Sequence, residues 1–363
     1  AGGGARRVDP SDAHRRGGRV SPAKTAAAAP AVTATANTNI ALIKYWGKAD
    51  ESLTIPTASS LSLTLDGTRT TTTVSFDGGA VGAGATNEER GGDAVTINGS
   101  SPGGAELARV TRFLDLVRAK SGESASATVA SFSTVPLAAG LASSAAGFAA
   151  LAAAASRAAG MRLDDRALSR LARRGSGSAT RSVFGGLVLW NAGVDDETSY
   201  AEPVECALDL AMVVVVLSER HKGISSTRAM RETMRSSPLY PAWVEAGRED
   251  LRAALAAVRR RDLPRLGEVV EANALGMHAA MIASRPGIMY WLPRTVEALG
   301  TIRAVRDEGL PVWATIDAGP NVKALTSRDS ADRVAAALRD RLPGATVSVR
   351  HPGTGVHVEE VVP

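Results

Sequence analysis

Two adjacent hydroxyl side chains, Ser143 and Ser144, lie in a run of small residues, PLAAGLASSAAG (136–147). Gly140 lets the backbone approach a ligand closely, and the Ala-rich run over 145–159 predicts a helix. An anion at such a helix start meets unpaired backbone N–H groups and the positive end of the helix dipole. The spacing matches neither the dinucleotide nor the Walker pattern. The segment indicates a phosphate-binding loop, with a serine-capped Ala-rich helix as the alternative.

A second polar cluster occurs in NTNIALIKYWGK (37–48), directly after an expected strand. Lys44, Lys48 and the phenol of Tyr45 suit a multiply charged anion, because lysine acts as a mobile point charge and the phenol adds a directional donor. Two solvated lysines beside a packed Tyr-Trp pair are the alternative for any one of these residues.

The segment GSGSATRSVFGG (175–186) carries Ser176, Ser178 and Arg181 within one turn. A Gly/Ser turn exposes N–H and O–H donors, and a nearby guanidinium can hold a carboxylate or phosphate through two hydrogen bonds. Taken alone, the same composition is typical of a flexible loop.

The segment SERHKGISSTRAM (218–230) leaves an apolar strand and enters a basic, hydroxyl-rich turn. Lys222, Ser225 and Ser226 are its candidate ligand-binding residues. Helix capping by Ser225 or Ser226 is the alternative, and capping does not exclude ligand binding.

The segment WATIDAGPNVKAL (313–325) ends an apolar strand in a carboxylate, Asp317, before the chain turns. An acid at the end of a buried strand is costly unless it is paired or chemically useful. Asp317 is therefore a candidate for chemistry, and a turn-capping hydrogen bond is the alternative.

Periodicity and turn residues predict an α+β protein in which strands and helices intermix in both halves, with lobes at 31–200 and 201–363. The expected strands are 31–42, 60–76, 95–97, 125–132, 184–191, 211–217, 312–317 and 346–350. The expected helices are 105–120, 145–159, 164–173, 226–235, 240–260, 263–284, 290–308 and 330–342. Residues 44–57 are expected to form a polar loop, and the almost uniformly apolar 211–217 a buried strand.

Composition limits the partners of the folded part. Of 363 residues, 44% are hydrophobic and 22% charged, which is ordinary for a soluble globular protein, and no apolar run is long enough to span a bilayer. The formal net charge is +5, of which residues 1–30 supply +4, from six basic and two acidic side chains. The remainder is nearly neutral, so we expect no nucleic-acid partner and no membrane partner. A single cysteine, Cys206, excludes an internal disulfide and fits a reducing cytoplasm.

Residues 1–30 contain Gly, Ala, Arg and Pro with almost no large apolar side chains. Such a segment buries too little surface to offset the entropy of ordering, so we expect a disordered tail without a role in catalysis. An organellar transit peptide is the alternative interpretation of its Arg-rich, acid-poor composition.

Together, the four motifs KYWGK, GLASSAAG, GSGSATRS and IDAGPN resemble those of the GHMP kinase superfamily and, within it, the diphosphomevalonate decarboxylase family, over about 33–342. The resemblance implies a GHMP kinase fold, with a ribosomal-protein-S5-like N-terminal lobe, an α/β C-terminal lobe and the active site in the cleft between them. It implies ATP-dependent conversion of 5-diphosphomevalonate to isopentenyl diphosphate, CO2, ADP and phosphate in the mevalonate pathway. ATP as co-substrate, Mg2+, a homodimer and a cytoplasmic location are implied with it.

The resemblance also implies roles for individual residues. Asp317 acts at the 3-hydroxyl as a base or an electrostatic partner, Arg181 holds the substrate carboxylate, and Lys222 lies near the transferred phosphoryl group. The implied substrate-binding residues are Asn39, Tyr45, Lys48, Ser176, Gly177, Ser178 and Arg181, with Asn39 orienting Arg181. The implied ATP-binding residues are Gly140, Ser143, Ser144, Ala145, Ser225 and Ser226. No metal-ligand motif is present, so Mg2+ arrives with ATP, with Ser144 as its candidate ligand.

One departure from the family pattern and two alternative functions accompany this assignment. The family often has an arginine directly after the serine matched by Ser226, whereas this chain has Thr227 there and Arg228 next. His278 is expected to be structural. One alternative function is a kinase that phosphorylates a mevalonate-type alcohol, or acts on a monophosphate, without decarboxylation. The other is a protein of the superfamily that only binds a ligand or partner.

Overall fold

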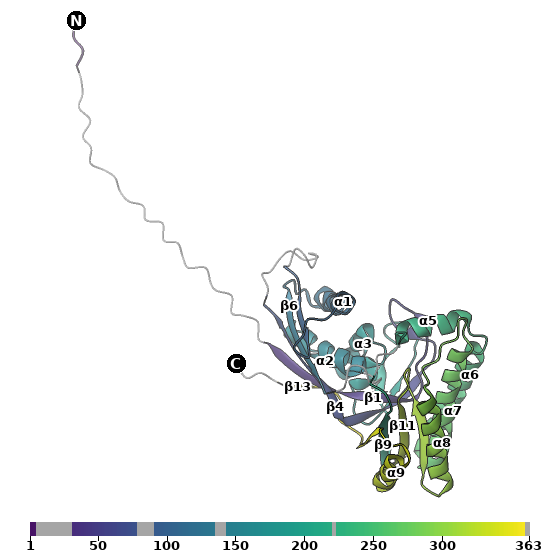
Figure 1. The fold of residues 1–363 in the computed structure, drawn as a ribbon. Coiled ribbons are helices and arrows are strands. Elements are labelled where there is room, and N and C mark those ends of the chain that lie inside the picture. The colour runs from purple at the N-terminus through teal and green to yellow at the C-terminus, as the bar shows by residue number, and fades with distance from the viewer. Residues whose placement is uncertain (5–30, 78–90, 135–142, 220–222, 360–363) are drawn as a thin grey trace.

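The chain folds around two main β-sheets, each covered by helices, and the computed structural model describes residues 1–4, 31–77, 91–134, 143–219 and 223–359 (Figure 1). The strands are β1 (Val32–Ile43), β2 (Lys48–Asp50), β3 (Ile55–Pro56), β4 (Ser60–Phe76), β5 (Ala94–Ile97), β6 (Ala127–Ser133), β7 (Leu187–Trp190), β8 (Ala201–Pro203), β9 (Leu210–Val216), β10 (Val312–Ile316), β11 (Val322–Ser327), β12 (Thr346–Arg350) and β13 (His357–Glu359). The helices are α1 (Gly104–Ser121), α2 (Ser143–Ala158), α3 (Asp165–Gly175), α4 (Ala179–Ser182), α5 (Ser226–Ser236), α6 (Tyr240–Arg260), α7 (Leu263–Ile282), α8 (Pro293–Asp307) and α9 (Arg328–Arg341).

The first sheet has seven strands, in the order β13-β1-β4-β6-β5, with β7 pairing with β4 and β8 with β7. Helices α1, α2 and α3 pack on it and enclose the first core, to which α2 contributes a continuous series of buried alanines. A helix that is apolar on every side must be buried, and its small side chains let its backbone lie close to β1 and β4. The start of α2 is thereby held firmly against the sheet.

The second sheet has four strands, in the order β10-β11-β9-β12, and it is covered on both faces. Helices α6 and α7 pack on one face, and α8 and α9 on the other. The apolar strand β9 is buried along nearly its whole length, as its composition predicted.

The two sheets share one core, because β1 and β4 extend beyond the first lobe. Ile40 and Leu42 of β1 and Leu63 of β4 lie in the same buried cluster as Met212 of β9 and Leu266 of α7. Figure 1 shows α1 and α2 on one side of the molecule and α6–α8 on the other, with β1 between them. The end of β1 therefore emerges where the two lobes meet.

The predicted α+β class and GHMP kinase fold are confirmed by the solved structures described below. The predicted helix over 240–260 and the predicted strand over 346–350 have the observed bounds. Within the described residues, no helix is both long and apolar enough to cross a membrane.

Several local expectations were wrong. Residues 44–57 are not entirely loop, because β2 and β3 pair there, and the expected strand over 184–191 is shortened to β7. The helix α4 and the strands β8, β11 and β13 were not predicted. Strands β8 and β13 are too short to show an alternating pattern, and each exists through pairing with a neighbour in the first sheet.

Candidate active site

A pocket of about 800 Å³ opens where the first lobe meets α5, α7 and the end of β10. Its walls include the segment after β1, α1, the start of α2, the turn between α3 and α4, and the start of α5. The sequence-predicted residues that line it are Asn39, Tyr45, Lys48, Ser144, Ser176, Gly177, Ser178, Arg181, Ser225, Ser226 and Asp317. Tertiary folding thus brings residues from all of the predicted motifs to one cavity.

Tyr45 forms part of the floor beneath the Ser176–Ser178 turn. Its ring packs edge-on against Trp190, with ring centroids 4.7 Å apart, and burial raises the pKa of its phenol. A Cβ added to Gly177 would lie 2.7 Å from the phenol oxygen, so only glycine permits this approach. The Tyr45 hydroxyl has no hydrogen-bond partner within the described structure, which leaves it available to a ligand.

Arg181 is 2% exposed and is held rigidly at the base of the pocket. Its Nε donates to Oδ1 of Asn39 at 3.2 Å, and its Nη1 donates to Oγ of Ser60 at 2.6 Å. The amide of Asn39 in turn donates to the Ser178 carbonyl at 3.0 Å and to Ser182 Oγ at 2.8 Å. Burial lowers the pKa of Arg181 to about 10, against the opposing effect of Asp317, so the guanidinium remains charged at neutral pH.

Asp317 lies between two ammonium groups at the end of β10. Lys44 Nζ donates to Oδ1 at 2.8 Å, and Lys323 Nζ is 3.1 Å from Oδ2. Burial by itself would raise the pKa of Asp317, but Lys323 and then Lys44 outweigh it and hold the pKa well below its usual range. The side chain is 23% exposed and lines the pocket, so an ionised carboxylate faces any ligand bound there.

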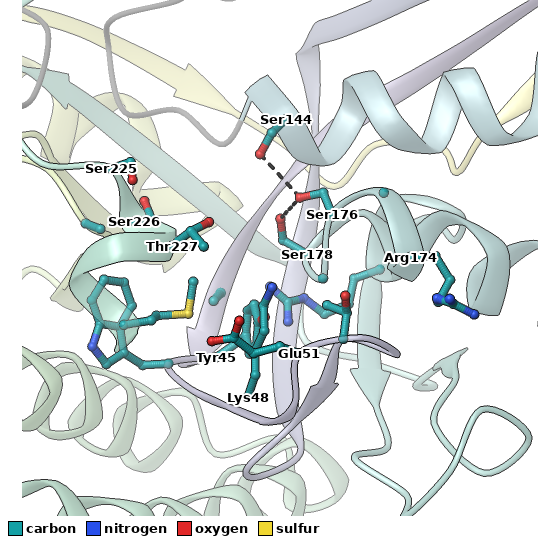
Figure 2. A pocket seen from close by; sticks show the side chains of 18 of the residues that line it. Tyr45, Lys48, Glu51, Ser144, Arg174, Ser176, Ser178, Ser225, Ser226 and Thr227 are labelled. Carbon is teal, nitrogen blue, oxygen red and sulfur yellow. Dashed lines mark hydrogen bonds between the residues drawn. The ribbon is translucent and has the colours of Figure 1, made fainter. Parts of the chain in front are cut away.

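The starts of α2 and α5 both reach this pocket. Ser144 Oγ lies 3.4 Å from Ser176 Oγ, which lies 3.5 Å from Ser178 Oγ, and Figure 2 shows these three hydroxyls together. Ser225 caps α5 by accepting from the backbone N–H of Arg228 at 3.3 Å. Ser225 therefore both caps α5 and lines the pocket, two roles that were expected to be compatible. Two helix starts provide the positive dipole ends and hydroxyl donors that suit phosphate groups.

The fit of a divalent cation depends on these hydroxyls. The described residues hold no cluster of three or more His, Cys, Asp or Glu side chains arranged to bind a metal. Ser144 nevertheless presents an oxygen at a helix start facing the pocket, and a serine hydroxyl beside phosphate oxygens suits Mg2+, which keeps several of its waters. The residues present therefore fit a cation that arrives with a nucleotide.

Other predicted residues either lie outside the described structure or do not line the pocket. Gly140 and Lys222 lie outside the described residues, and of Ser143 only its position as the first residue of α2 is described. Ala145 is fully buried, and its side chain does not line the pocket. His278 is also buried, as expected of a structural residue, and contacts the Trp291 ring at a centroid distance of 5.2 Å.

The structure adds residues that the motifs did not single out. Ser60 bonds Arg181, Lys323 pairs with Asp317, and Thr227, the residue where the expected arginine is missing, lines the pocket. Cationic side chains not singled out from the sequence also line it: Arg109, Arg112 and Arg174. Lys323 could have been found from the sequence, because it is a single charged residue in an otherwise apolar stretch after Asp317. Arg109 and Arg112 could not, because their pattern is that of the solvated face of a helix.

Two models of known protein families match most of this chain. Residues 36–201 match the diphosphomevalonate decarboxylase-like N-terminal domain, and residues 212–359 match the mevalonate 5-diphosphate decarboxylase C-terminal domain. The chain belongs to the diphosphomevalonate decarboxylase family.

Curated members of the family are similar over most of their length. The human diphosphomevalonate decarboxylase is 36% identical over 342 residues, covering 87% of this chain and 82% of the human protein. The Candida albicans diphosphomevalonate decarboxylase is 33% identical and covers 84% and 86%, respectively.

Solved decarboxylase structures have the same fold. The mevalonate diphosphate decarboxylase from Enterococcus faecalis superposes with a TM-score of 0.83 at 40% identity, covering 91% of this chain and 99% of that one. The Staphylococcus aureus enzyme gives a TM-score of 0.84 at 40% identity, covering 91% and 98%. A further structure, with a TM-score of 0.84 at 41% identity and 91% and 99% coverage, was solved with MVAPP, AMPPCP and magnesium.

Proposed function

We infer that the pocket catalyses the ATP-dependent decarboxylation of 5-diphosphomevalonate, which yields isopentenyl diphosphate, CO2, ADP and phosphate in the mevalonate pathway. The observation that carries this conclusion is the grouping of Asp317, Arg181 and two hydroxyl-bearing helix starts around one pocket. Membership of the diphosphomevalonate decarboxylase family supports the same reaction.

The order of steps follows from the chemistry of a tertiary alcohol, which is a poor leaving group. The 3-hydroxyl first accepts the γ-phosphoryl group of ATP. The C–O bond to phosphate then breaks, and the electron pair of the C–CO2 bond forms the new double bond as CO2 leaves. Catalysis of such a transfer is mainly positioning and electrostatic stabilisation, which rigidly held charged groups provide.

In this proposal Asp317 acts at the 3-hydroxyl as an oriented anion. Its two flanking ammonium groups keep it ionised, so it is a weak base and acts through its charge. Arg181 holds the substrate carboxylate in a fixed orientation, and Asn39 orients Arg181 through the 3.2 Å hydrogen bond. Release of neutral CO2 is favoured when the carboxylate is held without freedom to rotate.

The diphosphate is assigned to Tyr45, Lys48 and the turn formed by Ser176, Gly177 and Ser178. Tyr45 offers a phenol without a partner in the described structure, and Lys48 offers an ammonium. Ser176, Gly177 and Ser178 add hydroxyl and backbone donors from one turn.

The ATP phosphates are assigned to the starts of α2 and α5. Ser144, Ser225 and Ser226 supply hydroxyls there, and Gly140, Ser143 and Ala145 belong to the same proposed phosphate-binding motif, 136–147. Mg2+ bound with the nucleotide neutralises charge on the phosphates, and Ser144 is its proposed protein ligand. Lys222 is proposed to lie near the transferred group.

We also propose a homodimer in the cytoplasm, with lobes at 31–200 and 201–363 and a tail at 1–30. The family resemblance supports the dimer, and the single cysteine supports a reducing compartment.

The test is the product balance with 5-diphosphomevalonate labelled at its carboxylate carbon, with ATP and Mg2+. We expect one CO2 for each ADP, and no CO2 when ATP is omitted. ADP without CO2 would identify a kinase instead, and absence of both products would overturn the proposed reaction.

A further inference from the structure

Lys323 occupies a position where a charged side chain is energetically costly. It lies in β11, and its side chain is 1% exposed. Its neighbours Val322 and Ala324 belong to the core beneath α8 and α9, whereas Leu325, on the same face as Lys323, packs in the core beneath α6 and α7. An ammonium group inside the protein requires a compensating anion.

That anion is Asp317, and the geometry of the contact is specific. Lys323 Nζ lies 3.1 Å from Oδ2, while Lys44 Nζ lies 2.8 Å from Oδ1. Lys44 is itself anchored, because its Nζ also donates to the Ala41 carbonyl at 2.8 Å. Oδ1 accepts a hydrogen bond from Lys44, and Oδ2 is held by the charge of Lys323 at ion-pair distance, so rotation of the carboxylate would weaken both contacts.

The other charged and titratable groups around Asp317 come from α4 and α7. Arg181 is close enough to influence Asp317 electrostatically, and so is His278, which burial keeps neutral by lowering its pKa to about 3. The described groups facing Asp317 are therefore Lys44, Lys323, Arg181 and a neutral His278. Both Lys323 and Lys44 lower the pKa of Asp317, against the opposing effect of burial.

We propose that Lys323 is a positioning residue for the decarboxylation, fixing Oδ2 of Asp317 so that an ionised, correctly oriented carboxylate faces the reacting hydroxyl. This inference rests on the proposed role of Asp317. Lys44 holds the other oxygen, and the pair together leave Asp317 with little basicity.

The experiment compares Lys323→Met with the wild type over a pH range, with both substrates saturating. Methionine retains the length and volume of the side chain without its charge. We expect kcat to fall about tenfold or more near neutral pH, with both KM values changed less than about threefold. Loss of the positive neighbour raises the pKa of Asp317, so the ratio of variant to wild-type kcat should decrease further as the pH is lowered toward that raised pKa. Taking the ratio cancels the titration of the substrates themselves.

Two matched variants separate positioning from packing. Lys323→Arg retains a cation, so its kcat ratio should be independent of pH. Leu325→Ala changes the same face of the same strand, so it should lower the melting temperature without making the kcat ratio depend on pH.

A kcat ratio for Lys323→Met that stays constant across pH, or a kcat within about twofold of wild type, would overturn the proposal. If Lys323→Met does not fold, Lys323→Gln is measured in the same way, and failure of both to fold would assign Lys323 to stability alone. The role of Asp317 is tested separately with Asp317→Asn. Normal activity of that variant would contradict the proposed role of Asp317 itself. If Asp317→Asn is inactive while the kcat ratio of Lys323→Met does not depend on pH, only the proposed role of Lys323 is contradicted.

Discussion

At the residue scale, burial and neighbouring charge determine what Asp317 can do. The same carboxylate in water would be a weak but ordinary base, whereas here two lysines stabilise its ionised form. An anion that is not protonated in the working pH range stabilises positive charge and accepts a hydrogen bond, and it takes up a proton only at a large cost.

We expect Asp317→Asn to lower turnover by about a thousandfold or more, because it removes the charge while keeping the shape. ATP affinity should remain near the wild-type value, since Asp317 is assigned to the hydroxyl and not to the nucleotide. Steady-state kinetics and a nucleotide-binding titration measure the two effects. Asp209→Asn is the matched control, because Asp209 is a surface residue paired with Arg328. Near-normal turnover of Asp317→Asn would contradict its proposed role.

Gly177→Ala is expected to weaken binding of the diphosphate substrate, with KM rising about tenfold or more. The added Cβ would lie 2.7 Å from the Tyr45 hydroxyl, and the ring cannot easily yield because it packs against Trp190. Gly300→Ala is the control, since it adds the same group on α8 with nothing within 4 Å. Unchanged KM for Gly177→Ala would show that the turn and Tyr45 do not act together on the substrate.

At the scale of elements, α7 positions an unprotonated histidine against the end of β10. His278 is 1% exposed, and its Nε2 has no hydrogen-bond partner within the described structure. Burial lowers its pKa to about 3 from the ordinary value of 6.5. The unfolded chain therefore binds a proton at this residue in a pH range where the folded chain does not.

This linkage predicts a pH dependence of stability. The contribution of His278 is complete above its unfolded pKa and is lost as the pH falls from 6.5 toward 3, by up to about 1.4 kcal/mol per pH unit. His278→Asn retains a side-chain donor but does not titrate, so the loss over this window should be smaller. Urea denaturation at several pH values gives the free energies of unfolding. Equal slopes for both proteins would indicate that His278 becomes protonated within the folded state.

At the scale of the whole molecule, the two lobes are joined by a shared buried cluster and by the pairing of the last strand, β13, with the first, β1. β13 pairs with β1 in the first sheet, although its residues lie far beyond the predicted boundary near 200. The pocket depends on the contact between the lobes, since its described lining residues come from both of them.

Deletion of residues 1–30 should leave turnover within about twofold of the full chain, because the described residues that line the pocket, from Asn39 onward, already supply every group assigned to the reacting substrate. The rate of CO2 release measured side by side for the two chains provides the comparison. A large loss would show that the tail contributes to the active enzyme.

The sequence alone determined the features that depend on local chemistry. The hydroxyls at the start of α2, the Ser176–Ser178 turn, Arg181 and the carboxylate at the end of β10 were recognised because short-range spacing decides a turn, a helix start or a strand end. Long helices such as α6 were predicted well because periodicity accumulates over many residues.

Only the tertiary structure decided which groups meet, both within one hairpin and between segments far apart in the sequence. Nothing in the chain near Lys323 indicates that Asp317 will be its partner, because that contact requires the turn after β10 to bring β11 back antiparallel to it. The pairing of β13 with β1 and the shared core likewise join segments far apart in sequence. Such contacts are selected by the packing of the whole chain, since a buried charge or a short strand is stable only where its partner has already been placed.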